Sequence, residues 1–153
     1  MRIPIKSVML FVLAIALNSN ISHAETTDDG VAGINKDRAS KNYIINCQGC
    51  HLSGGEGSDG GAPSMVGVVA NFLNAPGGRE FLLRVPGVAT TALKSDAVAE
   101  MMNWLIYEFD AEHVPADFKP FTTQEVQMRR KKPYVQEAAK IRKQLVAFLE
   151  TKQ

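Results

Sequence analysis

Apolar residues recur at helical spacing along most of the chain, and nothing in the pattern predicts a sheet. Residues 93–109 read LKSDAVAEMMNWLIYEF, with apolar positions on one face of a helix. Ser95 or Asp96 is the expected N-cap, because short polar side chains accept hydrogen bonds from the first turn. A second amphipathic helix is predicted over 134–150. The pattern therefore predicts an all-α fold. The apolar face of 93–109 comprises Val98, Met101, Met102, Leu105 and Phe109.

Shorter helices are predicted between prolines and glycines. Residues 36–46 have the composition of a short helix, and residues 79–85 form another candidate between two Pro-Gly breaks. Thr122 and Glu125 have the spacing of a capping box, which starts a helix that Pro133 would end. The core face of the first short helix would hold Tyr43 and Ile44.

The predicted helix at 134–150 lies beyond a polar, proline-containing connector. Its apolar stripe predicts a helix that wraps the preceding domain, since such a stripe is rarely left bare on a monomer. The alternative is an arm that binds a partner. We expect a domain over 25–110 and a connector with a helical extension over 111–153. The stripe comprises Val135, Ala138, Ala139, Ile141, Leu145, Val146 and Leu149.

The first residues have the layout of a secretory signal peptide. Arg2 and Lys6 precede an apolar run over 8–17, and residues 22–24 form a small-x-small cleavage site. The run is shorter than the roughly 20 residues that span a bilayer. We therefore expect residues 1–24 to be removed and the mature chain to be a soluble protein of the bacterial periplasm. The alternative is a chain anchored there by an uncleaved signal.

Charge is balanced overall but unevenly distributed. Residues 25–118 carry 6 basic and 13 acidic side chains, whereas residues 119–153 carry 9 basic and 3 acidic ones. Most of these charges are expected on solvated helix faces. The polarity also suits oriented docking onto a partner, because clustered charge steers encounter. The short basic run at 129–132 gives no basis for nucleic-acid binding.

The chain has two cysteines, and they form a C-x-x-C-H motif. Cys47 and Cys50 are followed directly by His51, and a glycine-rich loop comes next. In an exported protein this motif predicts covalent haem attachment. Two thiols on one turn can bond the two haem vinyl groups, and the next imidazole can bind the iron as proximal ligand. One covalently bound haem c is therefore the predicted cofactor.

Two other uses of the cysteines compete with haem attachment. A redox-active dithiol normally belongs to a βαβ setting, and the flanking segments here look helical. Structural zinc requires four ligands. Only His51 and His113 could join the cysteines after removal of the signal peptide, and His51 is poorly placed to share an ion with Cys50. Haem attachment is the favoured interpretation.

With Tyr43, the C-x-x-C-H motif and the glycine loop ending in APSMVG, the chain resembles small monohaem class I cytochromes c. The resemblance covers about residues 35–110. It implies that Tyr43 packs the helix before the motif and that the Pro63 carbonyl binds the second ring nitrogen of the proximal histidine. Such a bond fixes the ring and raises its basicity. The resemblance also implies that the last helix of the domain crosses the helix before the motif, with Trp104 packing the crossing.

The sixth iron ligand departs from the family pattern. The family normally places a methionine in the loop before its last helix, but residues 84–95 contain none, and Lys94 is a distant substitute. We take Met65 as the tentative distal ligand, because it lies in a glycine-rich loop free to reach the iron. Its alternative role is packing on the histidine side of the ring. An open sixth position is the other alternative. The remaining candidates are Met101, Met102, Met128 and His113.

Two arginines could contact a haem propionate. Arg79 and Arg84 flank the predicted helix at 79–85, and arginine binds carboxylates in a bidentate manner. The alternative is a pair of surface arginines bound to local acids.

An electron carrier is the function predicted from these features, rather than an enzyme. The chain shows no nucleotide loop and no Ser/His/Asp set. Expected partners are periplasmic redox proteins: a dehydrogenase as donor, and a cytochrome or oxidase as acceptor. A role as the cytochrome subunit of a dehydrogenase is compatible with this prediction. The alternative is a haem sensor or peroxidase-like protein with an open sixth position.

Overall fold

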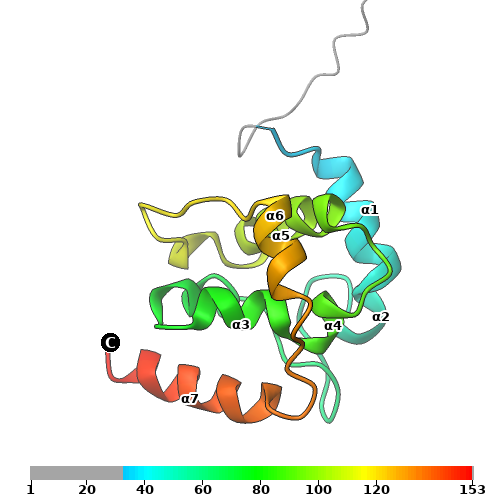
Figure 1. Cartoon of the computed structure of the whole chain (residues 1–153). Coiled ribbons are helices and arrows are strands. Elements are labelled where there is room, and N and C mark those ends of the chain that lie inside the picture. The colour runs from blue at the N-terminus through cyan, green and yellow to red at the C-terminus, as the bar shows by residue number, and fades with distance from the viewer. Residues whose placement is uncertain (1–32, 153) are drawn as a thin grey trace, which may run out of the picture.

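The computed structural model describes residues 33–152, and every regular element in that range is a helix (Figure 1). The all-α prediction is confirmed. No helix in this range has the length and apolar character needed to cross a membrane. The predicted signal peptide lies outside the described residues. The elements are α1 (Lys36–Asn46), α2 (Gln48–His51), η1 (Asn71–Asn74), α3 (Gly78–Arg84), α4 (Pro86–Ala89), α5 (Ser95–Asp110), η2 (Ala111–His113), α6 (Thr123–Arg129) and α7 (Ala138–Glu150).

The crossing of α1 and α5 positions the cysteine motif. Tyr43 of α1 is fully buried, and its ring centroid lies 5.8 Å from that of Trp104 and 5.1 Å from that of Phe109. Such tilted aromatic pairs add stabilisation beyond the area they bury. Glu100 of α5 accepts two hydrogen bonds from Arg38 at 2.6 Å, near the start of α1. The predicted crossing and the predicted packing role of Trp104 are confirmed.

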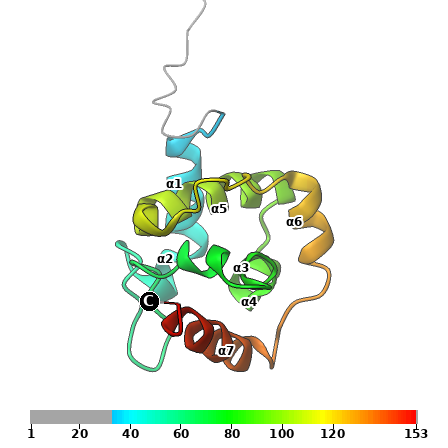
Figure 2. The ribbon, with the colours of Figure 1, turned by 90° about the vertical axis from the view of Figure 1, so that its left-hand side faces the viewer.

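The remaining helices form layers around α3. In Figures 1 and 2, α5 lies on one side of α3 and α7 lies on the other. The rings of Phe72 in η1 and Phe81 in α3 meet edge to face at 5.3 Å inside this arrangement. The buried core joins residues of η1, α3, α5, α6 and α7 into one hydrophobic cluster.

The C-terminal segment is part of this core. Phe121, Val126, Leu145 and Leu149 are all buried. α7 packs on η1 and α3, so its apolar stripe is covered within the chain. This agrees with the prediction of a wrapping helix rather than a free arm.

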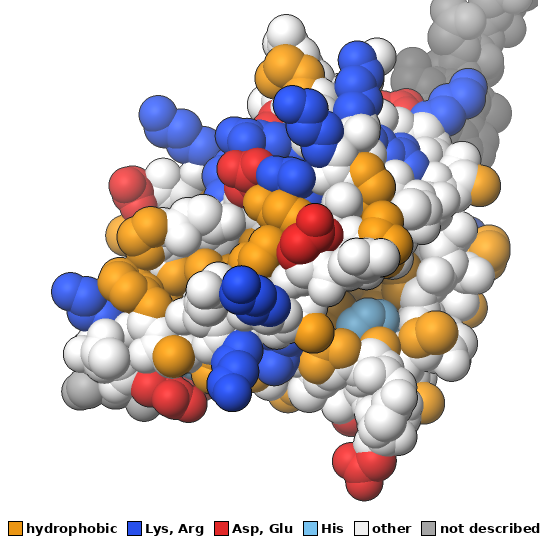
Figure 3. All heavy atoms as spheres, turned by 60° about the horizontal axis from the view of Figure 1, so that its bottom comes forward, with side chains coloured by type: hydrophobic (Ala, Val, Ile, Leu, Met, Phe, Trp, Pro, Cys, Tyr) orange, Lys and Arg blue, Asp and Glu red, His pale blue; other side chains and the backbone are white. Residues whose placement is uncertain are grey.

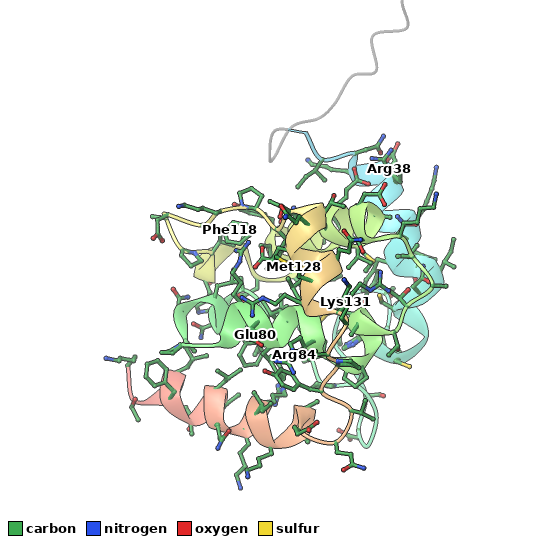
Figure 4. The ribbon with its side chains drawn as sticks, in the orientation of Figure 1. Arg38, Glu80, Arg84, Phe118, Met128 and Lys131 are labelled. Carbon is green, nitrogen blue, oxygen red and sulfur yellow. The ribbon has the colours of Figure 1, made fainter. Side chains whose placement is uncertain are left out.

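Two arginines of α3 also bind the C-terminal segment, through ion pairs and hydrogen bonds. Arg79 forms a bidentate pair with Glu125, with N–O distances of 2.6 and 2.8 Å, and also donates to the backbone carbonyls of Lys119 and Pro120. Arg84 donates to Glu80 and to the carbonyl of Lys132, and its guanidinium stacks 3.6 Å from the Tyr134 ring centroid. Figure 4 shows Glu80 and Arg84 on the side of α3 that faces α7.

Several predicted details differ from the structure. Ser95 is the first helical residue of α5, and Lys94 takes the N-cap position without a side-chain cap. Ile44 is 53% exposed, because its neighbour Tyr43 occupies the core face of α1. α7 begins at Ala138 rather than 134, since residues 132–134 are held against α3 by hydrogen bonds with Arg84. Thr122 caps α6 through the Glu125 N–H at 3.1 Å, but the Glu125 carboxylate turns to Arg79.

Candidate functional site

The C-x-x-C-H motif forms one tight turn at the end of α1. Cys47 closes α1 by donating its N–H to the Tyr43 carbonyl at 2.8 Å, and its own carbonyl accepts from Cys50 and His51 at 3.1 and 3.0 Å. Both thiols and the imidazole therefore project from a single turn. Leu52 ends this turn with a φ of 62°, and the Tyr43 hydroxyl donates to its carbonyl at 2.6 Å. A buried core residue thus fixes the backbone directly after the motif.

His51 makes the contact that the family resemblance implies. Its Nδ1 lies 3.1 Å from the carbonyl oxygen of Pro63. The predicted pairing is confirmed, and it leaves Nε2 as the ring nitrogen open to a metal. Burial lowers the pKa of His51, and the bond to the Pro63 carbonyl partly opposes that shift. Burial therefore favours the neutral imidazole, which is the form that binds iron, and the Pro63 bond orients the ring.

The glycine-rich loop after His51 is closed by its own backbone. Gly57 donates to the His51 carbonyl at 3.0 Å, and Met65 donates to the Gly55 carbonyl at 2.8 Å. Gly55 has a φ of 78°, and the Phe109 ring lies 3.0 Å from where a Cβ would stand. The glycine is required here by both conformation and space. The loop is a fixed support for Pro63 rather than a flexible tether.

The two thiols are unpaired and differently exposed. Cys47 is half-buried and Cys50 is exposed. Burial, followed by the neighbouring Cys50, raises the pKa of the Cys47 thiol. The Cys47 sulfur lies 3.9 Å from the Met101 sulfur of α5. The side chain of Met101 therefore packs beside the first cysteine.

A hollow on the molecular surface suits a large apolar group. Figure 3 shows a histidine side chain at the floor of a depression whose rim is hydrophobic. Figure 2 shows α2 with the loop that follows it on one side and α3 and α4 on the other. Three exposed apolar residues lie in or next to the motif and its loop. They are Ile45, Leu52 and Val66, with exposed fractions of 79%, 46% and 48%.

These donors fit a c-type haem better than the two alternatives. Thiols, an oriented imidazole and apolar walls match a covalently tethered porphyrin with a histidine ligand. In the described range, no cluster of three or more His, Cys, Asp or Glu side chains could hold a metal ion, which leaves structural zinc without support. The motif also follows a helix in an all-helical setting, unlike a thioredoxin-type dithiol.

Met65, the tentative distal ligand, lies on the same side as His51. It is two residues after Pro63, and its N–H is bound to Gly55 at the base of the closed loop. The predicted loop freedom is wrong, and its alternative role of packing on the histidine side fits the structure better.

The other candidate ligands are occupied or distant from the motif. Met101 and Met102 are 0% and 2% exposed within α5. Met128 is 57% exposed on α6 and lies far from α2 in Figure 4. His113 binds the buried Asp110 through Nδ1 at 2.5 Å. Of the four, Met101 alone contacts the motif, through the Cys47 sulfur, whereas the ring contact of His51 is with Pro63.

The predicted propionate contacts of Arg79 and Arg84 also have another explanation. Both guanidinium groups are engaged by Glu125, Glu80 and backbone carbonyls, as the alternative of ion pairs predicted. A third arginine, for which no sequence pattern predicts a role, contacts the segment before α5. Arg130 donates to the carbonyls of Ala89 and Leu93 at 3.1 and 2.7 Å and also to that of Thr91.

Cytochromes of one bacterial species resemble this chain. Cytochrome c-552 of Thermus thermophilus is 34% identical over 119 residues, covering 65% of this chain and 90% of that protein. A second cytochrome c-552, from a particular strain of the same species, has the same identity over 119 residues, with 65% of this chain and 80% of that protein covered. No protein-family model matches the chain. With the helical fold, the cysteine turn and these similarities together, the chain belongs to the monohaem c-type cytochromes related to cytochrome c-552.

Proposed function

We propose that this protein carries single electrons on one haem c, tethered through Cys47 and Cys50 and bound at its iron by His51. The observation that carries the proposal is the His51–Pro63 contact within the C-x-x-C-H turn, because it orients the imidazole with Nε2 free. The bound haem supplies the one-electron chemistry. The chain supplies a ligand, an apolar rim and a docking surface.

A rigid support suits this role. The imidazole is held by Pro63, Pro63 by the closed loop, and the loop by the Phe109 ring against Gly55. A fixed imidazole would not have to reorient when the haem gains or loses an electron. No residue of this site is arranged as a general acid or base, which favours a carrier over an enzyme.

We further propose periplasmic redox proteins as partners: a dehydrogenase as donor, and a cytochrome or oxidase as acceptor. The predicted signal peptide over 1–24 supports export. The exposed lysines of residues 119–152, on and around α6 and α7, support transient docking onto an acidic surface.

The attachment is tested by replacing the cysteines in the full chain, expressed with haem-attaching machinery in a bacterial periplasm. Wild-type pigment should remain with the polypeptide in acidified acetone. Cys47→Ser and Cys50→Ser together should release it, and each alone should shift the pyridine haemochrome band towards that of a single thioether. Gly49→Ser is the matched control, since a side chain there meets no atom within 4 Å. Extraction of the wild-type pigment would refute the proposal.

The carrier role is tested on the purified haem protein. Repeated reduction with ascorbate and oxidation with ferricyanide should return the same spectrum without loss of pigment. Turnover of a substrate by the isolated protein, or bleaching within a few cycles, would argue against a carrier.

A further inference from the structure

The segment before α5 contacts the motif at a point other than Pro63. Thr91 donates through Oγ1 to the Asn46 side chain at 3.2 Å, directly before Cys47. Val85, Val88 and Leu93 pack against the same hydrophobic cluster as Cys47. We take residues 85–93 as the cover of the ring face away from Pro63, because Thr91 contacts the residue directly before Cys47 whereas Pro63 holds His51.

Residues 85–93 contain no side chain that binds iron well. They read VPGVATTAL, with no methionine, histidine, lysine or cysteine. Hydrogen bonds from Arg130 also hold the segment in one position. Arg130 uses Nε, Nη1 and Nη2 on the carbonyls of Ala89, Leu93 and Thr91, respectively. These charge-assisted bonds fix three alternate residues of the segment at once.

None of the methionines in the described range is placed as a sixth iron ligand. Met65 is anchored on the His51 side by its N–H bond to Gly55. Met101 touches the Cys47 sulfur, so it lies at the tethered rim of the ring rather than over its centre. Met102 is buried within α5 and Met128 is exposed on α6.

We infer that the sixth coordination position of this haem carries no side chain and is open to a small exogenous ligand, with Arg130 as the positioning residue that fixes the segment above it. The inference rests on the proposed function, since it requires the haem that His51 binds. It differs from an ordinary electron carrier, in which both axial positions are occupied by the protein.

The character of residues 85–93 selects the class of ligand. The segment carries no charged side chain, and its side chains are mostly apolar. An anion would lose hydration there without gaining a counter-charge from residues 85–93 themselves. The Arg130 guanidinium already donates hydrogen bonds to three backbone carbonyls, so it cannot also polarise a bound peroxide. The site therefore fits a neutral diatomic gas rather than cyanide or peroxide.

Carbon monoxide is the probe. The covalent haem protein, verified first by acid-acetone retention, is reduced with dithionite and exposed to the gas. Wild type should show an immediate Soret shift that light reverses, and Met65→Leu should behave identically. A ferrous spectrum unchanged by carbon monoxide, with binding appearing only in Met65→Leu or Lys94→Ala, would overturn the inference. Because haem retention is measured separately, failure of attachment cannot be confused with a closed sixth position.

The role of Arg130 is tested by rebinding after flash photolysis. Arg130→Leu should free residues 89–93 and change the carbon monoxide association rate several-fold, and Arg130→Lys should restore the wild-type rate only in part. Lys131→Leu is the matched control, because Lys131 is an exposed neighbouring cation (Figure 4) for which no ion pair with another described residue is found. Equal rates in Arg130→Leu and wild type, with the fold intact by circular dichroism, would refute the assignment.

Discussion

Asn103 and Phe121 exchange two hydrogen bonds across the junction between α5 and the C-terminal segment. The Asn103 amide donates to the Phe121 carbonyl at 2.9 Å, and its carbonyl oxygen accepts from the Phe121 N–H at 2.7 Å. Both residues are buried, so water cannot replace either bond. A side chain here completes a backbone pairing that the helix and the loop cannot make with one another.

Replacement of Asn103 should therefore destabilise the protein strongly. Asn103→Leu keeps a similar volume but leaves a buried N–H and a buried carbonyl without partners, which should cost about 3 kcal/mol in the free energy of unfolding. Urea denaturation of the haem protein measures the loss. Gln127→Leu, on the exposed side of α6, should change stability by less than about 0.5 kcal/mol. Similar losses in both variants would contradict the pairing.

Substitutions at two glycines of the loop after His51 should distinguish the cost of backbone strain from the cost of a steric clash. Gly55 and Gly60 have φ values of 78° and 71°, but a Cβ at Gly55 would lie 3.0 Å from the Phe109 ring and one at Gly60 meets nothing within 4 Å. Gly60→Ala should cost about 1 kcal/mol from strain alone. Gly55→Ala should cost clearly more and should also shift the reduction potential, because it displaces the loop that holds Pro63. Equal free energies of unfolding for Gly55→Ala and Gly60→Ala, measured by urea denaturation, would show that the Phe109 ring moves aside without cost.

Glu80 should make stability depend on pH in the acid range. Its hydrogen bond from Arg84 lowers its pKa below the ordinary 4.5, with Arg129 adding to the effect and partial burial opposing it. The advantage of wild type over Glu80→Gln should be complete above about pH 4.5 and should vanish as the pH falls through the lowered pKa. Urea denaturation from neutral pH to about pH 3 measures it. In an Arg84→Met background the advantage should shrink, and a constant difference across this range would contradict the pairing.

Leu149 should show that α7 belongs to the stable core. It is 7% exposed, and Leu149→Ala removes buried methyl groups against the core formed by η1 and α3. The expected loss is about 2 to 3 kcal/mol in the free energy of unfolding. Val135→Ala is the control, since Val135 is 68% exposed and should change stability by less than about 0.5 kcal/mol. A second, separate unfolding transition for α7 would contradict a shared core.

Local patterns predicted the helices and the proximal half of the site. The spacing of Val98, Met102 and Leu105 predicts α5, and the C-x-x-C-H turn predicts the thiols and imidazole of one site. The Pro63 contact followed from the family resemblance. These features depend on residues that are neighbours in the sequence or on one short loop, so the sequence contains most of the information that fixes them.

The distal half depends on contacts between distant residues, and the sequence does not display them. Arg130 lies in a basic run that resembles any solvated surface, yet it binds the carbonyls of Leu93 and Thr91, far earlier in the chain. Met65 follows a glycine-rich stretch that suggests mobility, yet backbone bonds close the loop around it. Backbone acceptors are the same for every residue type, so no sequence pattern reveals which ones a distant arginine will bind.

Because α7 is synthesised after every other described helix, the interior between η1 and α3 stays incomplete until Leu145 and Leu149 have been made. We expect Cys47 and Cys50 to be more accessible to a thioether-forming enzyme before this interior is complete. We expect delayed closure of this kind to lengthen the window for haem attachment, and a chain without α7 to lose native packing around a haem that has already been attached.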